Sequence, residues 1–251
     1  MSNLNFLFMS KESFHEKFIE ACRAGAHEAV AKMLTHKKAD VNRPDKRFGA
    51  TGLYYACQRG RLGVVKALLQ DSELDVNSVA ACTGASGFVT ADYLFPSRFH
   101  PTPLHVACAR GNLELVELLL QHPLIDANLV ANNMTPLQAA INNGQVHVVR
   151  YLVSHAKVDI NALNNTLNSA LHLACANGHV EIAALLLQQP EIVFDSKNQA
   201  GVFPANLAAQ ERHFEVAKLF MRFLAYQDRS QPKMVTVLPH MSLDVDVVLV
   251  I

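Results

Sequence analysis

The sequence lacks an excess of charge of either sign. It contains 22 lysine and arginine residues and 22 aspartate and glutamate residues, so the formal net charge at pH 7 is zero. Proteins that bind nucleic acids or other polyanions normally carry a clear basic excess. The charge balance therefore argues against a nucleic-acid-binding protein.

Signals for secretion or membrane insertion are also missing. The apolar residues between Leu4 and Phe8 follow no basic segment, and Lys11 and Glu12 end the run, so it is neither a signal peptide nor a membrane span. The five cysteines show no C-x-x-C spacing, which fits a reducing compartment better than a disulfide framework. We expect a cytoplasmic protein without a membrane anchor.

Motifs that carry catalysis are absent as well. The sequence has no glycine-rich phosphate loop, no nucleophile elbow, no H-E-x-x-H and no paired-carboxylate arrangement. We therefore expect neither enzymatic activity nor a cofactor.

The sequence does contain an internal repeat. Short segments of small and apolar residues each end at a glycine, with consecutive spacings of 35, 51, 33 and 34 residues, at Gly25, Gly60, Gly111, Gly144 and Gly178. The single long spacing indicates an insertion of about 17 residues between the second and third units.

The third unit shows how each repeat should fold. Thr102 can cap a helix while Pro103 occupies its first turn, and Gly111 supplies the left-handed residue that ends it. Residues 113–120 then repeat apolar side chains at helical spacing, and residues 122–128 form a finger loop that leads to the next unit. Because such short helices are unstable alone, the units must stack.

These residues resemble the ankyrin repeat. Residues 102–105, Thr-Pro-Leu-His, and 135–138, Thr-Pro-Leu-Gln, match its helix opening, and residues 75–77 and 159–161 match its finger. The resemblance covers about residues 14–224 and implies an all-α solenoid of about six helix–turn–helix units. The expected divisions are an extension at 1–13, units at 14–42, 49–77, 102–128, 135–161, 169–195 and 202–224, an insertion at 78–100, and a tail at 225–251.

Three departures from the family pattern affect these units. Gly52 and Ala170 replace the helix-opening proline, so those helix starts should be less firmly fixed. Arg212 replaces the helix-ending glycine of the last unit, at a cost of about 1 kcal/mol if it keeps left-handed geometry. We interpret the first and last units as degenerate caps.

Cysteine and histidine recur together in the repeat. His105 and His172 each stand three residues before a cysteine, a spacing that could pair ligands on a helix. However, four cysteines each precede a repeat glycine by three residues, which predicts one repeated core position, at Cys22, Cys57, Cys108 and Cys175. The resemblance implies that His105 and His172 instead join neighbouring fingers. Cys82 alone lies outside the repeat, and we expect an inert loop thiol.

The resemblance also implies where a partner protein binds. Ankyrin proteins use a concave face made of the helix residues before each glycine, here including Arg23, Gln58 and Ala109, and of the finger residues before the helix opening. Arginine and aromatic residues are the usual binding hot spots, although exposed arginines can also be simply solvated. The candidate partner-binding residues are Arg47, Phe48, Arg59, Tyr93, Phe95, Arg98, Phe99, Arg110, Met134 and Asn143.

The insertion and the tail carry further expectations. Residues 78–100 begin small and flexible but end rich in aromatic side chains, so the insertion should either fold over the concave face or contact the partner and set partner choice. Residues 228–241 read as a linker. Residues 242–251 alternate and then become wholly apolar, so they should pack on the last repeat or, alternatively, add as a strand to a PDZ-like domain.

The favoured function is therefore a monomeric adaptor or scaffold that binds an acidic or mixed protein surface. The alternatives are an effector with a concealed enzymatic activity, acting in a host cytoplasm, and a nucleic-acid reader. The leucine, spacer and Asp-Val-Asn pattern of residues 69–77 also resembles the preferred site of an ankyrin-directed asparaginyl hydroxylase. This resemblance makes Asn77, and after it Asn161, candidate modification sites.

Overall fold

The computed structural model describes residues 9–36, 39–46, 48–80 and 101–230, with side chains to residue 226. Within these residues the protein folds into twelve α-helices and no strand longer than a single bridge. The inner helix of each successive pair is α1 Lys11–Ala24, α3 Gly52–Gln58, α5 Pro103–Ala109, α7 Pro136–Asn142, α9 Ala170–Ala176 and α11 Pro204–Gln210. The outer helices are α2 His27–Leu34, α4 Leu62–Leu68, α6 Leu113–Leu120, α8 Val146–Val153, α10 Val180–Leu187 and α12 Phe214–Ser230.

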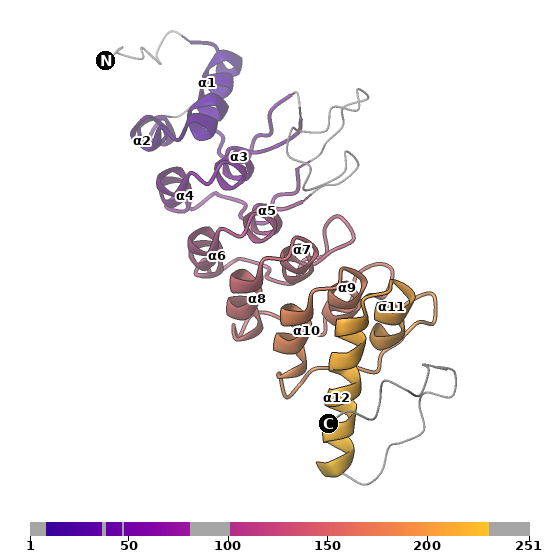
Figure 1. Ribbon diagram of the computed structural model, residues 1–251. Coiled ribbons are helices and arrows are strands. Elements are labelled where there is room, and N and C mark those ends of the chain that lie inside the picture. The colour runs from indigo at the N-terminus through magenta and orange to yellow at the C-terminus, as the bar shows by residue number, and fades with distance from the viewer. Residues whose placement is uncertain (1–8, 37–38, 47, 81–100, 231–251) are drawn as a thin grey trace.

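The helix pairs stack in one direction and form two layers, one of inner and one of outer helices (Figure 1). The loops after the outer helices project as fingers beside the inner helices. We number them by unit: the first finger spans residues 39–50, the third 121–134, the fourth 154–168 and the fifth 188–203, and the second is described over 70–80. The inner helices and the fingers together form the surface that we call the concave face.

All described inner helices except α11 start at a residue whose hydroxyl caps them. The hydroxyls of Thr51, Thr102, Thr135 and Ser169 each accept a hydrogen bond from the backbone N–H three residues on, which satisfies one of the free donors of a helix start. The units that open with Gly52 and Ala170 keep the same cap geometry without proline. Ser10 caps α1 in the same way, whereas α11 follows Phe203, which makes no side-chain cap. The hydroxyl cap is therefore shared by every described inner helix except α11.

Left-handed residues end the inner helices as expected. The five repeat glycines have φ between 65° and 87°, and Arg212 adopts φ 63° in the last unit. At Gly111 the geometry is doubly restrictive, because a Cβ there would collide with the side-chain amide of Gln145. That amide donates to the carbonyl of Ala109 at 3.2 Å, so the missing side chain makes room for a contact between neighbouring units.

This crowding predicts that substitution by alanine lowers the free energy of unfolding more at Gly111 than at Gly201. Gly201 has φ 75° with nothing within 4 Å of its would-be Cβ, so Gly201→Ala should cost only the backbone strain, about 1 kcal/mol. Gly111→Ala should cost about 2 kcal/mol, since the Gln145 hydrogen bond is lost as well. Urea unfolding of both variants checks the order, and equal costs would contradict it.

The core runs through the whole stack. Buried apolar side chains extend from Phe14 in α1 to Phe220 in α12. The repeated cysteine position is part of it, since Cys22, Cys57, Cys108 and Cys175 all have 0 % exposure. Burial raises the pKa of the Cys22 and Cys175 thiols to about 12, so these groups stay protonated. The predicted core position is confirmed.

Both ends of the repeat extend further than the sequence predicted. Helix α1 begins at Lys11, within the expected extension, because the Ser10 hydroxyl caps it by accepting from the Ser13 N–H at 3.1 Å. Helix α12 continues to Ser230, past the expected end of the unit at 224 and into the expected linker. No glycine or proline occurs between Phe214 and Pro232 to stop it.

Candidate functional site

The N-terminal end of the concave face holds a cluster of one arginine, one acid and two aromatic residues, which we call the Arg23 cluster. Arg23 lies in the last turn of α1, Asp45 and Phe48 lie in the first finger, and Tyr55 lies in α3. The Arg23 guanidinium is 3.3 Å from an Asp45 carboxylate oxygen. Its central carbon sits 3.8 Å from the centre of the Tyr55 ring and 6.0 Å from that of Phe48.

Asp45 organises both the finger and the cluster. One carboxylate oxygen accepts from the backbone N–H groups of Phe48 and Ala50 at 3.1 and 3.0 Å. The other accepts from Arg23 and from the Tyr55 hydroxyl, the latter at 3.0 Å. Burial, with the Asp45 charge, raises the pKa of Tyr55, so the phenol remains a donor. The cluster is thus held rigidly while the Arg23 side chain stays 36 % exposed.

The structure places five of the sequence-predicted partner-binding residues. Arg59 is exposed at the end of α3, and Phe48 is half-buried in the Arg23 cluster. Arg110 is half-buried at the end of α5, with its Nε shielded from solvent. Asn143 ends α7 and donates to the Ala139 carbonyl at 2.9 Å, and Met134 lies half-buried at the end of the third finger.

Two implied helix positions need correction. Gln58 and Ala109 have exposures of 6 % and 0 %, because neighbouring inner helices pack against each other at this level, so neither can touch a partner. The candidates Arg47, Tyr93, Phe95, Arg98 and Phe99 lie outside the described residues, as do residues 81–100 of the insertion and 231–251 of the tail.

Sequence reasoning missed Asp45 and Tyr55. Both reside in segments separate from Arg23, so no local pattern joins them. The one available signal was the combination of a finger acid with an arginine two residues before the glycine of the same unit.

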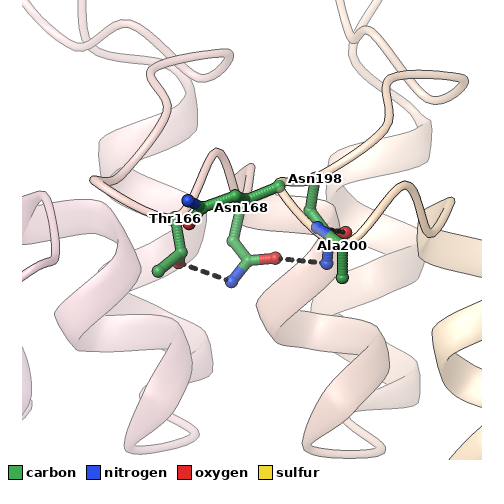
Figure 2. A pocket seen from close by; sticks show the side chains of 5 residues that line it. Thr166, Asn168, Asn198 and Ala200 are labelled. Atoms are coloured by element: carbon green, nitrogen blue, oxygen red, sulfur yellow. Dashed lines mark hydrogen bonds between the residues drawn. The ribbon is translucent and has the colours of Figure 1, made fainter.

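The C-terminal part of the concave face contains a hollow with an uncharged lining. Between the fourth and fifth fingers lies a hollow of about 390 Å³ lined by Thr166, Asn168, Asn198, Gln199 and Ala200 (Figure 2). The side chains of Thr166, Asn168 and Asn198 form a hydrogen-bonded row along it. The two ends of the concave face therefore offer different chemistry.

The described residues hold no group of three or more histidine, cysteine, aspartate or glutamate side chains that could bind a metal ion. Nor does any described helix combine the length and apolar character needed to cross a bilayer. The sequence model of the family described as ankyrin repeats (3 copies) matches residues 17–80, 78–164 and 158–229. The chain belongs to the ankyrin-repeat family. A search of curated proteins finds no match.

Membership confirms the all-α ankyrin-repeat solenoid that the sequence predicted. Ankyrin repeats are generic protein–protein interaction modules. The finger role that the resemblance implied for the histidines is also present. His105 and His172 each contact the carbonyl before the next helix opening, at Met134 and Val202, over 2.9 and 3.0 Å.

A second set of bonds joins successive ankyrin fingers through asparagine side chains, which we call the asparagine ladder. The Asn77 amide donates to the Leu124 carbonyl at 2.7 Å and accepts from the Asp126 N–H at 2.9 Å. Asn42, Asn128 and Asn161 make the same pair of bonds to the finger that follows each of them. These asparagines therefore link units and do more than shape their own turns.

The ladder bears on the proposed hydroxylation. We expect incubation with an ankyrin-directed asparaginyl hydroxylase to add one oxygen to Asn77, and less to Asn161. Because the Asn77 side chain is half-buried and bonded at both ends, the finger must open first, so modification of the folded chain should be slower than that of a peptide covering residues 69–77. Mass spectrometry of the Asn77 peptide measures this, and no added oxygen on either substrate rejects the site.

Proposed function

We propose that the protein is an adaptor or scaffold that binds a partner protein with an acidic or mixed surface, through its concave face and the 78–100 insertion. The Arg23 cluster is the observation that carries this proposal. Arginine and aromatic side chains are the commonest hot-spot residues, and they act best when little freedom is lost on binding. Free buried thiols at all four described cysteines support a reducing, cytoplasmic location.

An exposed arginine outside the cluster favours an acidic group on the partner. Asp45 neutralises Arg23, but Arg59 is exposed one helix further on, and within the described residues no carboxylate lies within ion-pair distance of it. An arriving carboxylate can pair with Arg59. Tyr55 is buried, with 4 % exposure, so it holds Arg23 in place, and the cluster offers the partner the exposed parts of Arg23 and Phe48. The support for the insertion is its aromatic sequence alone.

Reversing the charge of Arg59 tests the concave face. Arg59→Glu should reduce partner capture by at least about thirtyfold, the effect of about 2 kcal/mol at a hot spot. Stability should change by less than about 0.5 kcal/mol because the side chain is exposed. The measurement is unbiased capture with the intact chain as bait, quantified by mass spectrometry. Arg110 is unsuitable for this test because its partial burial would mix folding with binding effects.

Lys66→Glu is the matched control. Lys66 is exposed on the outer helix α4, so it changes the net charge equally but away from the concave face, and capture should persist. A chain whose residues 81–96 are replaced by a short finger should lose the same proteins as Arg59→Glu. Identical sets of captured proteins from all four baits would reject the proposal.

A further inference from the structure

In the first, fourth and fifth fingers, one side chain accepts hydrogen bonds from the backbone of its own finger. This side chain is charged in the first finger and neutral in the other two. The Asp45 carboxylate accepts two backbone N–H groups of the first finger. Asn164 accepts from the N–H groups of Thr166 and Asn168 at 3.0 and 2.8 Å. Asn198 does the same with Ala200 and Val202 at 3.1 and 3.0 Å. Because an amide oxygen shapes the finger as well as a carboxylate does, folding does not require the acid.

Arg23, which pairs with Asp45 in the first unit, is also replaced in the fourth and fifth units. Arg23 stands two residues before the glycine of its unit, and the fourth and fifth units have Asn142 and Ala176 at that position. The fourth and fifth units have therefore lost both members of the Arg23–Asp45 ion pair, and these two positions carry no charge.

Three of the side chains that line the hollow between the fourth and fifth fingers are held in a fixed row. Asn168 donates to the Thr166 hydroxyl at 3.0 Å, and Asn198 donates to the Asn168 carbonyl oxygen at 2.9 Å (Figure 2). Thr166 in turn donates to Asn164 at 2.8 Å. The backbone N–H of Gln199 donates to the Thr166 carbonyl at 3.0 Å and ties the two fingers together. The amides are thus preorganised before any ligand arrives.

The side-chain amides of the row have hydrogen-bond donors and acceptors that the row itself does not use. A side-chain amide has two donors and an oxygen with two lone pairs. Asn168 uses one N–H and one lone pair within the row, and Asn198 uses one N–H. One donor of each amide and one acceptor of Asn168 therefore remain, and Gln199 adds an exposed amide. Donors and acceptors in one line suit an extended polypeptide, whose N–H and C=O groups alternate along its length.

Charge is disfavoured in the same hollow. None of its five lining residues is charged, and the neighbouring Lys197 holds its ammonium 5.0 Å from the centre of the Phe203 ring. An ionised group placed against the amide row would find no charged partner among the lining residues.

We infer that the hollow between the fourth and fifth fingers is a second subsite of the concave face, which binds an extended, uncharged segment of the partner by amide-to-main-chain hydrogen bonds. The inference rests on the proposed function, because it describes how one part of the bound protein is recognised. Arg59 then selects an acidic region of the partner, and the amide row selects a neutral region further along it.

The test uses the full chain, immobilised, and two pools of short peptides. One pool contains only serine, threonine, asparagine, glutamine, glycine and alanine, and in the other a third of the positions are glutamate or lysine. Asn198→Asp is the diagnostic variant, since its carboxylate can still accept from Ala200 and Val202, as Asp45 does in the first finger. Asn165→Asp is the matched control, because Asn165 is exposed on the fourth finger outside the hollow.

Wild type and Asn165→Asp should retain the uncharged pool. The charged pool is compared on Arg59→Glu, which lacks the exposed arginine that pairs with carboxylates, and this variant should leave it in solution. Asn198→Asp should retain about tenfold less of the uncharged pool, since it places an unpaired charge beside the row. Equal retention of the uncharged pool by the three chains, equal retention of both pools by Arg59→Glu, or no retention of the uncharged pool by wild type would each overturn the inference. Arg59→Glu should retain the uncharged pool fully, so this result is independent of the capture experiment.

Discussion

Replacing His105 with alanine is expected to lower the free energy of unfolding by about 3 kcal/mol. The ring is fully buried, with 0 % exposure, and both nitrogens are bonded. Nε2–H donates to the Met134 carbonyl at 2.9 Å, which leaves Nδ1 to accept from the Thr102 hydroxyl at 2.7 Å. Alanine would leave a cavity, an unpaired carbonyl and a finger detached from its helix opening.

His105→Gln is the matched control for this prediction. The fourth unit has Gln138 at the same position, and its side chain donates to the Ala162 and Asn168 carbonyls at 3.0 and 2.9 Å. Glutamine at 105 should therefore cost less than about 1 kcal/mol. Urea denaturation followed by circular dichroism gives both values. A loss below about 1 kcal/mol for His105→Ala would show that the finger contacts do not stabilise the stack.

Acidification is expected to remove a comparable amount of stability between pH 6.5 and 4. Burial lowers the pKa of His105 to about 4 in the folded chain, from an ordinary value of 6.5. Between these values the unfolded chain binds the proton and the folded chain does not, so stability falls as the pH falls. The full difference is about 3 kcal/mol. Burial also lowers the pKa of His15, His172 and His179, and these shifts act in the same direction.

Unfolding free energies measured at pH 7 and pH 4.5 check the acid prediction. His105→Gln removes one titrating group without removing the finger contact, so its loss of stability over this interval should be smaller than that of wild type by about 2 kcal/mol. If wild type and His105→Gln lose the same amount, His105 does not account for the acid sensitivity.

Most of the fold could be predicted because its signals are local and repeated. The Thr102 cap, the left-handed Gly111 and the buried Cys108 each lie within one unit and recur in others, so the period places them. The outer limits of α1 and α12 were less predictable. They depend on a single cap at Ser10 and on the absence of a stop signal before Pro232, neither of which belongs to the repeat.

The candidate site was only partly predictable because it joins distant segments. The exposure of Arg59 follows from its position beside a repeat glycine. The partial burial of Arg110, at the corresponding position, depends on what packs around it and could not be read from the period. The Arg23 cluster needs α1, the first finger and α3 together. Contacts between segments of this kind carry no sequence signature of their own.

The asparagine ladder has a consequence for the evolution of chain length. Each ladder asparagine donates to a carbonyl and accepts from an N–H of the following finger, so every finger presents the same backbone groups to its predecessor. A duplicated unit inserted among the first four fingers would find matching groups on both sides without any compensating mutation. In the fifth finger the corresponding residue is Asp195, whose side-chain carboxylate has no N–H to donate to a carbonyl. Gain or loss of whole units should therefore be tolerated within the stack. A unit added after the fifth finger would lack the ladder bond and should not be tolerated.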